Sequence, residues 1–201
     1  GSGRVLADAL PTEKWKSEIW KDGIGNIDEE HNGLGKFGSE YAFPYAKHVK
    51  AIHDIQRWFV EETRLGIPVD FTNEGIRGVC HEKATFFPAQ CGQGSTWNKE
   101  LARIGEVEAK EATALGYTNI YSPILDIAQD PRWGRAVECY GEDPYLVGQL
   151  GKQMIQSLQK HKLVATPKHF AVYSIPVGGR DGGTRTDPHV APREMRTLYL
   201  E

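Results

Sequence analysis

The chain has 201 residues, of which 39% are hydrophobic and 25% charged, and its formal net charge is −3. This composition is that of a globular protein with enough apolar residues for a sizeable core. Acidic and basic residues are interspersed, which argues against a nucleic-acid binder, and no apolar stretch has the length of a membrane span. Cys80, Cys91 and Cys139 lack metal-ligand spacing. Cys80 and Cys91 are able to pair, but the odd count favours three free thiols.

The N-terminal segment is irregular. Residues 13–20 carry a weak helical pattern, and the Asp22–Gly23 turn introduces a short strand at 24–27. The segment from Asn32 to Tyr45 is rich in glycine and aromatic residues and is expected to be a loop.

From Ala46 to Glu62 apolar residues recur at three- and four-residue steps, which predicts an amphipathic helix. Gly66 ends this helix, and Ile67–Thr72 has the apolar, β-branched character of a buried strand. Residues 78–97 have no clean period, so we expect a loop with an extended piece.

Asn98 is a suitable N-cap for a helix that runs to Ala114 and is stopped by Gly116. The apolar residues of one face of this helix are Leu101, Ile104, Val107 and Ala112. Residues 117–128, with the sequence YTNIYSPILDIA, predict the next strand and its exit.

Asp143 and Pro144 open a helix that reaches about Lys160, because proline at the first turn loses nothing there. Its inward residues are Leu146, Leu150, Met154, Ile155 and Leu158. A strand over Leu163–Phe170 follows, then a glycine-rich loop over 177–190, and a last helix begins near Ala191 and is still running where the sequence stops.

Strands that alternate with helices at this spacing predict βα units and a parallel sheet, hence an α/β fold. Only three or four units are present, fewer than the eight of a closed barrel. The alternatives are a small doubly wound domain and part of a (β/α)8 TIM-like barrel, and we favour the partial barrel, as one domain over residues 1–201. The GGRDGG stretch (178–183) lacks the spacing of a phosphate-binding loop.

Polar side chains follow three of the predicted strands. Glu74 comes after the first of these strands, Arg135 follows the second, and Lys168 and His169 end the third. Charged groups at the end of a buried run are costly unless they have a role there. At the carboxyl ends of barrel strands that role is usually substrate contact.

Each of these residues also has a structural alternative. Glu74 is able to pair with Arg77 on a surface turn, and Arg135 with Glu138 or Asp143 in its own loop. We interpret Glu138 as a residue that orients a cation rather than one that touches a ligand.

The aromatic and histidine residues have alternatives too. A lone His169 would more often be a hydrogen-bonded core residue, but its adjacency to Lys168 at a strand end favours function. Trp133 is either a stacking surface for a sugar or a buried loop anchor. We expect surface or structural roles for the other histidines considered, which are His81, His161 and His189.

The stretches GRAVECYGEDPYLVGQ and ATPKHFAVYS, with TNEGIRG upstream, resemble the catalytic barrel of glycoside hydrolase family 3, from about Gly23 onward. The resemblance implies a retaining β-glycosidase in which Glu74, Arg135, Lys168 and His169 hold a sugar in subsite −1. It implies a small β-xyloside or β-glucoside as ligand and no metal or organic cofactor, and it suggests export to the periplasm or outside the cell.

These residue types suit a sugar ring. Each ring hydroxyl is both donor and acceptor, so the Glu74 carboxylate accepts from neighbouring hydroxyls while Arg135, Lys168 and His169 donate to others. The planar fork of Arg135 is able to span two oxygens. One acid among three bases also limits the desolvation cost that each would bear alone.

The resemblance also implies what lies elsewhere. It places the nucleophilic aspartate and the acid/base beyond Glu201, and the first barrel strand before Gly1. We therefore expect the N-terminal portion of a barrel, truncated at both ends, that is inactive alone and partners the remainder of its parent polypeptide. The alternatives are a non-catalytic carbohydrate-binding barrel domain, and an unrelated doubly wound domain, for which the required phosphate loop is not found.

Glu74 predicts substrate preference. Family members with aspartate at this position are typically β-glucosidases, whereas glutamate resembles the β-xylosidase branch, because the extra methylene reaches into the space of a hydroxymethyl arm. In the natural polypeptide that carries this chain, Glu74→Asp should shift the ratio of p-nitrophenyl β-xyloside to β-glucoside hydrolysis towards glucoside, by about 1–3 kcal/mol at most. Unchanged rates on both substrates would remove Glu74 from subsite −1.

Overall fold

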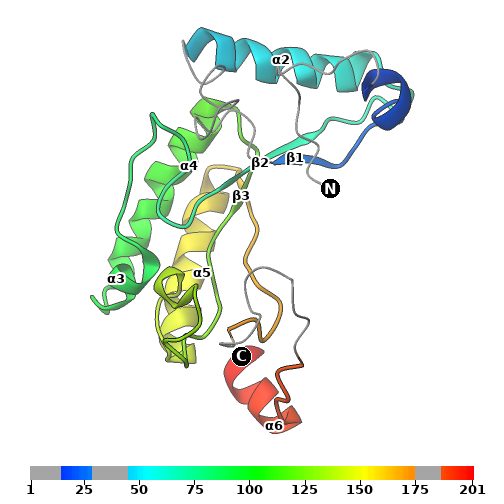
Figure 1. The fold of residues 1–201 in the computed structure, drawn as a ribbon. Coiled ribbons are helices and arrows are strands. Elements are labelled where there is room, and N and C mark those ends of the chain that lie inside the picture. The colour runs from blue at the N-terminus through cyan, green and yellow to red at the C-terminus, as the bar shows by residue number, and fades with distance from the viewer. Residues whose placement is uncertain (1–14, 29–44, 175–186) are drawn as a thin grey trace.

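The computed structural model describes residues 15–28, 45–174 and 187–201 (Figure 1). Most of the expected loop at 32–45, and residues 177–186 of the glycine-rich loop, lie outside these ranges. The elements in chain order are η1 (Trp15–Ile19), β1 (Asn26–Asp28), α2 (Tyr45–Glu61), β2 (Asp70–Glu74), α3 (Gln90–Gly94), η2 (Lys99–Arg103), α4 (Ile104–Leu115), β3 (Asn119–Tyr121), η3 (Ala136–Glu138), α5 (Pro144–Lys160), β4 (Val164–Ala165), α6 (Pro192–Glu194) and η4 (Met195–Tyr199).

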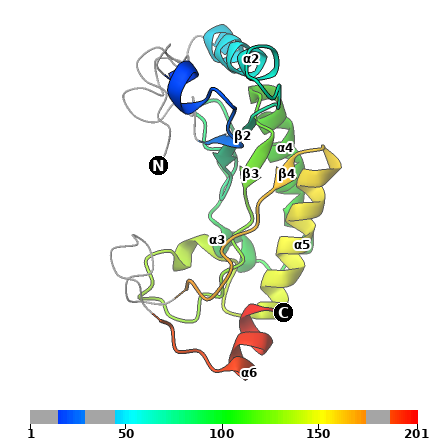
Figure 2. The same ribbon diagram turned by 90° about the vertical axis from the view of Figure 1, so that its right-hand side faces the viewer.

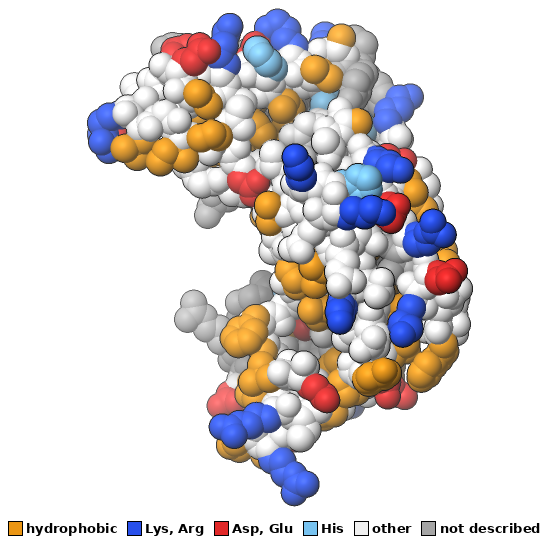
Figure 3. Space-filling view, turned by 180° about the vertical axis from the view of Figure 1, so that it is seen from behind, with side chains coloured by type: hydrophobic (Ala, Val, Ile, Leu, Met, Phe, Trp, Pro, Cys, Tyr) orange, Lys and Arg blue, Asp and Glu red, His pale blue; other side chains and the backbone are white. Residues whose placement is uncertain are grey.

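The four described strands form one parallel sheet in the order β1-β2-β3-β4. A strand order that follows the chain, with right-handed crossovers, carries every connecting helix to the same side of the sheet. A doubly wound sheet reverses its order and covers both faces. Figure 2 shows α2, α4 and α5 along one side of the strands, and the molecule is hollowed along one side (Figure 3). The predicted α/β fold, a partial barrel rather than a doubly wound domain, is confirmed.

One face of the sheet is apolar and packs against the helices. Ile27, Phe71 and Ile120 each project from a different strand and are almost completely buried. They join one core cluster with helix residues such as Ile55 and Leu158. Burial of this apolar layer is the main favourable contribution to the fold, at roughly 25 cal/mol per Å² of apolar surface.

The other face carries a polar ladder across all four strands. Asp70 accepts hydrogen bonds from Asn26 (3.2 Å) and Asn119 (2.9 Å) through its Oδ2 atom. Thr166, just beyond β4, donates to Asn119 Oδ1 at 2.7 Å. Because side chains alternate along a strand, Asp70 shares this face with Glu74, four residues further along β2. The ladder therefore connects the strands on the same face of the sheet that carries Glu74 at the carboxyl end of β2.

Local sequence signals explain where several helices begin and end. Asp143 caps α5 by accepting a hydrogen bond from the Leu146 N–H at 2.7 Å, and Pro144 occupies the first helical position. Gly116 ends α4 in the left-handed conformation with φ 91°. The expected short strand near 24–27 and the helix from Ala46 are confirmed as β1 and α2 to within one or two residues.

The predicted inward face of α4 is partly wrong. Val107 is 39% exposed, whereas Glu108 is completely buried beside Ala109 and Ala112. The reason is that the first turn after Asn98 is the 3-10 helix η2, and its three residues per turn rotate the start of α4 relative to a continuous α-helix.

Three other expectations need correction. The segment 78–97 contains a short helix, α3, that its irregular sequence did not indicate. The last helix is short, with α6 and η4 ending at Tyr199. The strand predicted over Leu163–Phe170 is regular only at β4. The N–H groups of Thr166 and Lys168 still donate to the carbonyls of Ile120 and Pro123. The donors are two residues apart and the acceptors three residues apart, and this mismatch breaks the regular ladder.

The three cysteines are free thiols, as expected. Cys139 is completely buried, and burial, with the nearby charge of Asp126, raises the pKa of its thiol to about 12. Within the described ranges, no helix combines the length and hydropathy that crossing a membrane requires.

Gly94 allows α3 to approach the loop that follows Arg135. A Cβ atom on Gly94 would lie 1.7 Å from the carbonyl oxygen of Tyr140, whereas one on Gly148, in α5, would meet nothing within 4 Å. Gly94→Ala should lower the free energy of unfolding by about 2–3 kcal/mol. Gly148→Ala should raise it by up to about 1 kcal/mol. Urea denaturation of both variants checks this, and equal effects would contradict the close approach.

Candidate functional site at the strand ends

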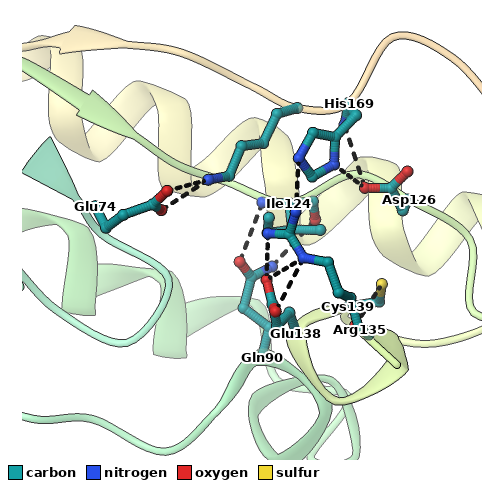
Figure 4. A network of polar contacts seen from close by, with 9 residues as sticks. Glu74, Gln90, Ile124, Asp126, Arg135, Glu138, Cys139 and His169 are labelled. Carbon is teal, nitrogen blue, oxygen red and sulfur yellow. Dashed lines mark hydrogen bonds and ion pairs between the residues drawn. The ribbon is translucent and has the colours of Figure 1, made fainter. Parts of the chain in front are cut away.

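The carboxyl ends of β2, β3 and β4 bring the predicted residues together (Figure 4). Glu74 is the last residue of β2, and Lys168 and His169 follow β4. Arg135 comes from the long loop after β3, immediately before η3. Parallel strands end at one edge of a sheet, so residues up to 95 positions apart in the chain meet here.

Lys168 joins the ends of the two strands that flank β3. Its Nζ atom donates to both carboxylate oxygens of Glu74, at 2.8 and 2.7 Å, and lies 5.3 Å from the ring centroid of Tyr121, the last residue of β3. The partner of Glu74 is therefore Lys168 rather than Arg77. A single ammonium group that meets both carboxylate oxygens fixes the orientation of the acid.

Arg135 is held by Glu138, as expected of a residue that orients a cation. The Arg135 Nε–H donates to both Glu138 oxygens at 3.0 Å, and Nη2 donates to Oε2 at 2.5 Å. Burial alone would lower the pKa of Arg135, but the hydrogen bond and charge of Glu138 outweigh it, so the pKa is raised. This edge of the guanidinium fork is already occupied. What remains to face a ligand is the Nη1 side, which contacts His169 Nε2 at 3.0 Å.

Asp126, which was not predicted, holds His169 from the other side. Its Oδ2 atom accepts from the backbone N–H of His169 at 3.2 Å and lies 2.7 Å from the ring Nδ1. Asp126 is 4% exposed. The signal was an aspartate inside the apolar run ILDIA, because a buried carboxylate requires a partner. The partner lies 43 residues away in the chain, which spacing alone does not reveal.

Tyr173 supports both His169 and Arg135. Its ring centroid is 4.6 Å from the His169 ring and 5.7 Å from Arg135 Cζ. Trp133 is 2% exposed and packs edge-to-face on Tyr173 at 5.4 Å, so it is a loop anchor. The aromatic rings of Tyr173 and Trp133 thus support the site from one side.

The other histidines considered differ in burial. His81 is buried beside His48, with ring centroids 5.2 Å apart, and burial and the charge of His48 lower its pKa to about 4. His161 is half-buried, and His189 is exposed. Among the residues that the structure describes, no group of three or more His, Cys, Asp or Glu side chains is placed to hold a metal ion.

The ionisable side chains of the site form three hydrogen-bonded pairs. Glu74 pairs with Lys168, Glu138 with Arg135, and Asp126 with His169. The expected arrangement of one acid among three bases is therefore incomplete, because two further carboxylates compensate the bases. A sheet edge lined by paired donors and acceptors is suited to a neutral, polyhydroxylated ligand, because each hydroxyl both donates and accepts.

A barrel sheet with acids and cations at its strand ends has the layout of a barrel enzyme's substrate site. The sequence pattern of the glycosyl hydrolase family 3 N-terminal domain matches residues 11–200. The chain belongs to this family of glycoside hydrolases.

Relatives of the chain include β-xylosidases and β-glucosidases. It is 38% identical over 152 residues to a β-xylosidase of Formosa agariphila, an alignment that covers 68% of this chain and 21% of that protein. It is 34% identical over 140 residues to a periplasmic β-glucosidase of Salmonella typhimurium, which covers 66% and 18%. The chain spans about a fifth of the length of these relatives.

Solved structures show the same likeness. A β-glucosidase from Erythrobacter marinus superposes with a TM-score of 0.77 at 30% identity, over 90% of this chain and 23% of that one. A mutant β-glucosidase from Listeria innocua, in complex with laminaribiose, gives a TM-score of 0.66 at 36% identity, over 75% and 21%.

Glu108 lies directly beneath the end of β2. A Cβ atom on Gly75 would be 1.9 Å from Glu108 Oε1, so this position requires glycine. Neither carboxyl oxygen of Glu108 has a hydrogen-bond partner among the described residues. Burial, with the charge of Glu111, raises the pKa of Glu108 well above its ordinary value of 4.5.

This raised pKa predicts how stability depends on pH. Above pH 4.5 the unfolded chain releases the Glu108 proton and the folded chain keeps it, so stability falls as pH rises towards the folded pKa, by about 1.4 kcal/mol per unit. Glu108→Gln should remove this contribution to the slope of unfolding free energy between pH 5 and 7. Glu106→Gln should leave the slope unchanged, because the Lys160 hydrogen bond lowers the pKa of Glu106. Parallel slopes for wild type and Glu108→Gln would contradict the assignment.

Proposed function

We propose that these residues form the sugar-binding part of the active site of a retaining, exo-acting β-glycosidase. In this proposal Glu74, Arg135, Lys168 and His169 hold the terminal β-D-xylosyl or β-D-glucosyl residue in subsite −1. The observation that carries it is the Lys168–Glu74 pair at 2.7 and 2.8 Å, at the same edge of the sheet as Arg135 and His169. Membership of glycosyl hydrolase family 3 supports it.

Exposure distinguishes Glu74 and His169, which would face a ligand, from Asp126, which supports the site from beneath. The side chains of Glu74 and His169 are 29% and 27% exposed, whereas that of Asp126 is 1% exposed. Lys168 uses two N–H groups on Glu74 and has a third to donate. A ring hydroxyl that accepts from Lys168 and donates to Glu74 would join both residues through charge-assisted hydrogen bonds.

The choice between xyloside and glucoside depends on Glu74. Its carboxylate lies on the face of β2 that also carries Asp70 and Thr72, away from the apolar face that packs on the helices. We favour a β-xyloside or related pentoside, with β-glucoside as the second substrate. Relatives with both names support a mixed preference rather than an exclusive one.

The catalytic pair would come from other parts of the natural polypeptide. A retaining enzyme needs a nucleophile and an acid/base about 5–5.5 Å apart. Three of the acids near the described strand ends, Glu74, Glu138 and Asp126, are each engaged by a cation or a histidine.

Lys168→Ala tests the proposal in the natural polypeptide that carries this chain. Hydrolysis of p-nitrophenyl β-xyloside and β-glucoside should lose about 100-fold or more in kcat/KM, because a charge-assisted contact is lost and Glu74 is left unpaired. Lys160→Ala is the matched control. It breaks an exposed pair with Glu106 on the outer helices and should leave kcat/KM unchanged.

The outcomes separate the two candidate functions. Equal kcat/KM for Lys168→Ala and wild type would contradict a sugar contact at this edge. If the wild-type polypeptide binds xylose or glucose but hydrolyses neither substrate, the protein is instead a non-catalytic carbohydrate-binding barrel.

A further inference from the structure

We infer that Asp126 is a positioning residue that fixes His169 as a neutral imidazole with its proton on Nδ1, so that Nε2 meets the ligand as a hydrogen-bond acceptor. This inference rests on the proposed function for its role in sugar binding. The protonation of the ring itself follows from the contacts of the ligand-free protein.

The first step concerns the Nε2 atom of His169. It lies 3.0 Å from Arg135 Nη1. A guanidinium group carries five N–H donors, has no acceptor and does not lose its proton in proteins. The hydrogen bond therefore runs from Arg135 to His169, and Nε2 must present its lone pair.

The second step concerns the Nδ1 atom. A neutral imidazole whose Nε2 accepts carries its one proton on Nδ1. That atom faces Asp126 Oδ2 at 2.7 Å, and the same oxygen accepts the His169 backbone N–H at 3.2 Å. Two donors from one residue converge on one carboxylate oxygen, so both the ring orientation and its tautomer are determined.

The third step is that the supports cannot easily move. The Asp126 side chain is 1% exposed, and the His169 ring packs at 64° on Tyr173 with centroids 4.6 Å apart. Arg135 is held in place by Glu138. If the proton moved to Nε2, two N–H donors would face each other at 3.0 Å and Nδ1 would lose its role as donor to Asp126.

The consequence reverses the role expected from the sequence. His169 was expected to donate to the sugar, but its Nε2 atom is an acceptor. A sugar hydroxyl would therefore donate to Nε2 in place of Arg135 Nη1–H, which frees that N–H to donate to a neighbouring sugar oxygen. The Asp126–His169 pair therefore selects for a hydroxyl group on the sugar carbon that faces Nε2, because a fluorine or an ether oxygen has no hydrogen to donate.

Asp126→Leu and Asp126→Asn test this in the natural polypeptide. Leucine has the shape of aspartate without an acceptor, whereas the asparagine carbonyl still accepts from Nδ1–H. We expect Asp126→Leu to lower kcat/KM for p-nitrophenyl β-xyloside by about 10- to 100-fold, and Asp126→Asn to recover most of the loss. Asp70→Leu is the control. It removes a half-buried hydrogen-bond acceptor at the opposite end of β2 and should reduce stability with KM unchanged.

Nitrogen NMR of the histidine-labelled, ligand-free protein is a readout that a merely structural role would not move. The His169 signals, identified by their loss in His169→Gln, should show a protonated Nδ1 and a bare Nε2 in wild type and Asp126→Asn. In Asp126→Leu, Arg135 still donates to Nε2, so the proton should stay on Nδ1, but the Nδ1–H group loses its carboxylate partner and its signal should shift. A wild-type ring protonated on Nε2 or on both nitrogens, or an Nδ1–H signal that is identical in wild type and Asp126→Leu, would overturn the inference. Because no sugar is present, this result is independent of the proposed function.

Discussion

The pairing of Lys168 with Glu74 across the end of β3 is the interaction on which the site depends. It joins residues 94 positions apart, and it exists because three parallel strands end at one edge in a defined register. Glu74 is aligned with Tyr121, and Lys168 forms a bridge with Ile124. A slip of one residue in β2 would turn Glu74 towards the helices. The sheet register, which the apolar core on the opposite face of the sheet determines, thus brings Lys168 and Glu74 together.

The second constraint is that each ionisable side chain in these three pairs has a hydrogen-bond partner before a ligand arrives. Isolated ions in a half-buried position cost several kcal/mol each, and pairing with hydrogen bonds offsets that cost. The pairs also orient donors and acceptors in advance. A sugar bound as proposed would replace some of the hydrogen bonds within the pairs, and the side chains would already be in position. Glu138 and Asp126 serve this purpose from beneath, and Tyr173 fixes the spacing between Arg135 and His169.

The sequence predicts the parts of the molecule that depend on local pattern. Helix periodicity, the Asp143 cap and the Gly116 stop locate α2, α4 and α5, and the motif residues locate the four side chains that lie together at the strand ends. What it misses depends on contacts between distant segments. Asp126 finds His169 only once β3 and β4 are side by side, and the burial of Glu108 follows from a 3-10 turn that shifts the phase of α4. The short helix α3 has too few residues to show a period.

The proposed function requires that a sugar ring sits against the ends of β2 and β4. The most direct measurement is a crystal structure of the natural polypeptide with xylose bound. We expect ring hydroxyls within hydrogen-bond distance of Glu74 and Lys168, and one hydroxyl that donates a hydrogen bond to His169 Nε2. A xylose bound elsewhere, with the Lys168–Glu74 pair undisturbed and solvent at the strand ends, would contradict it.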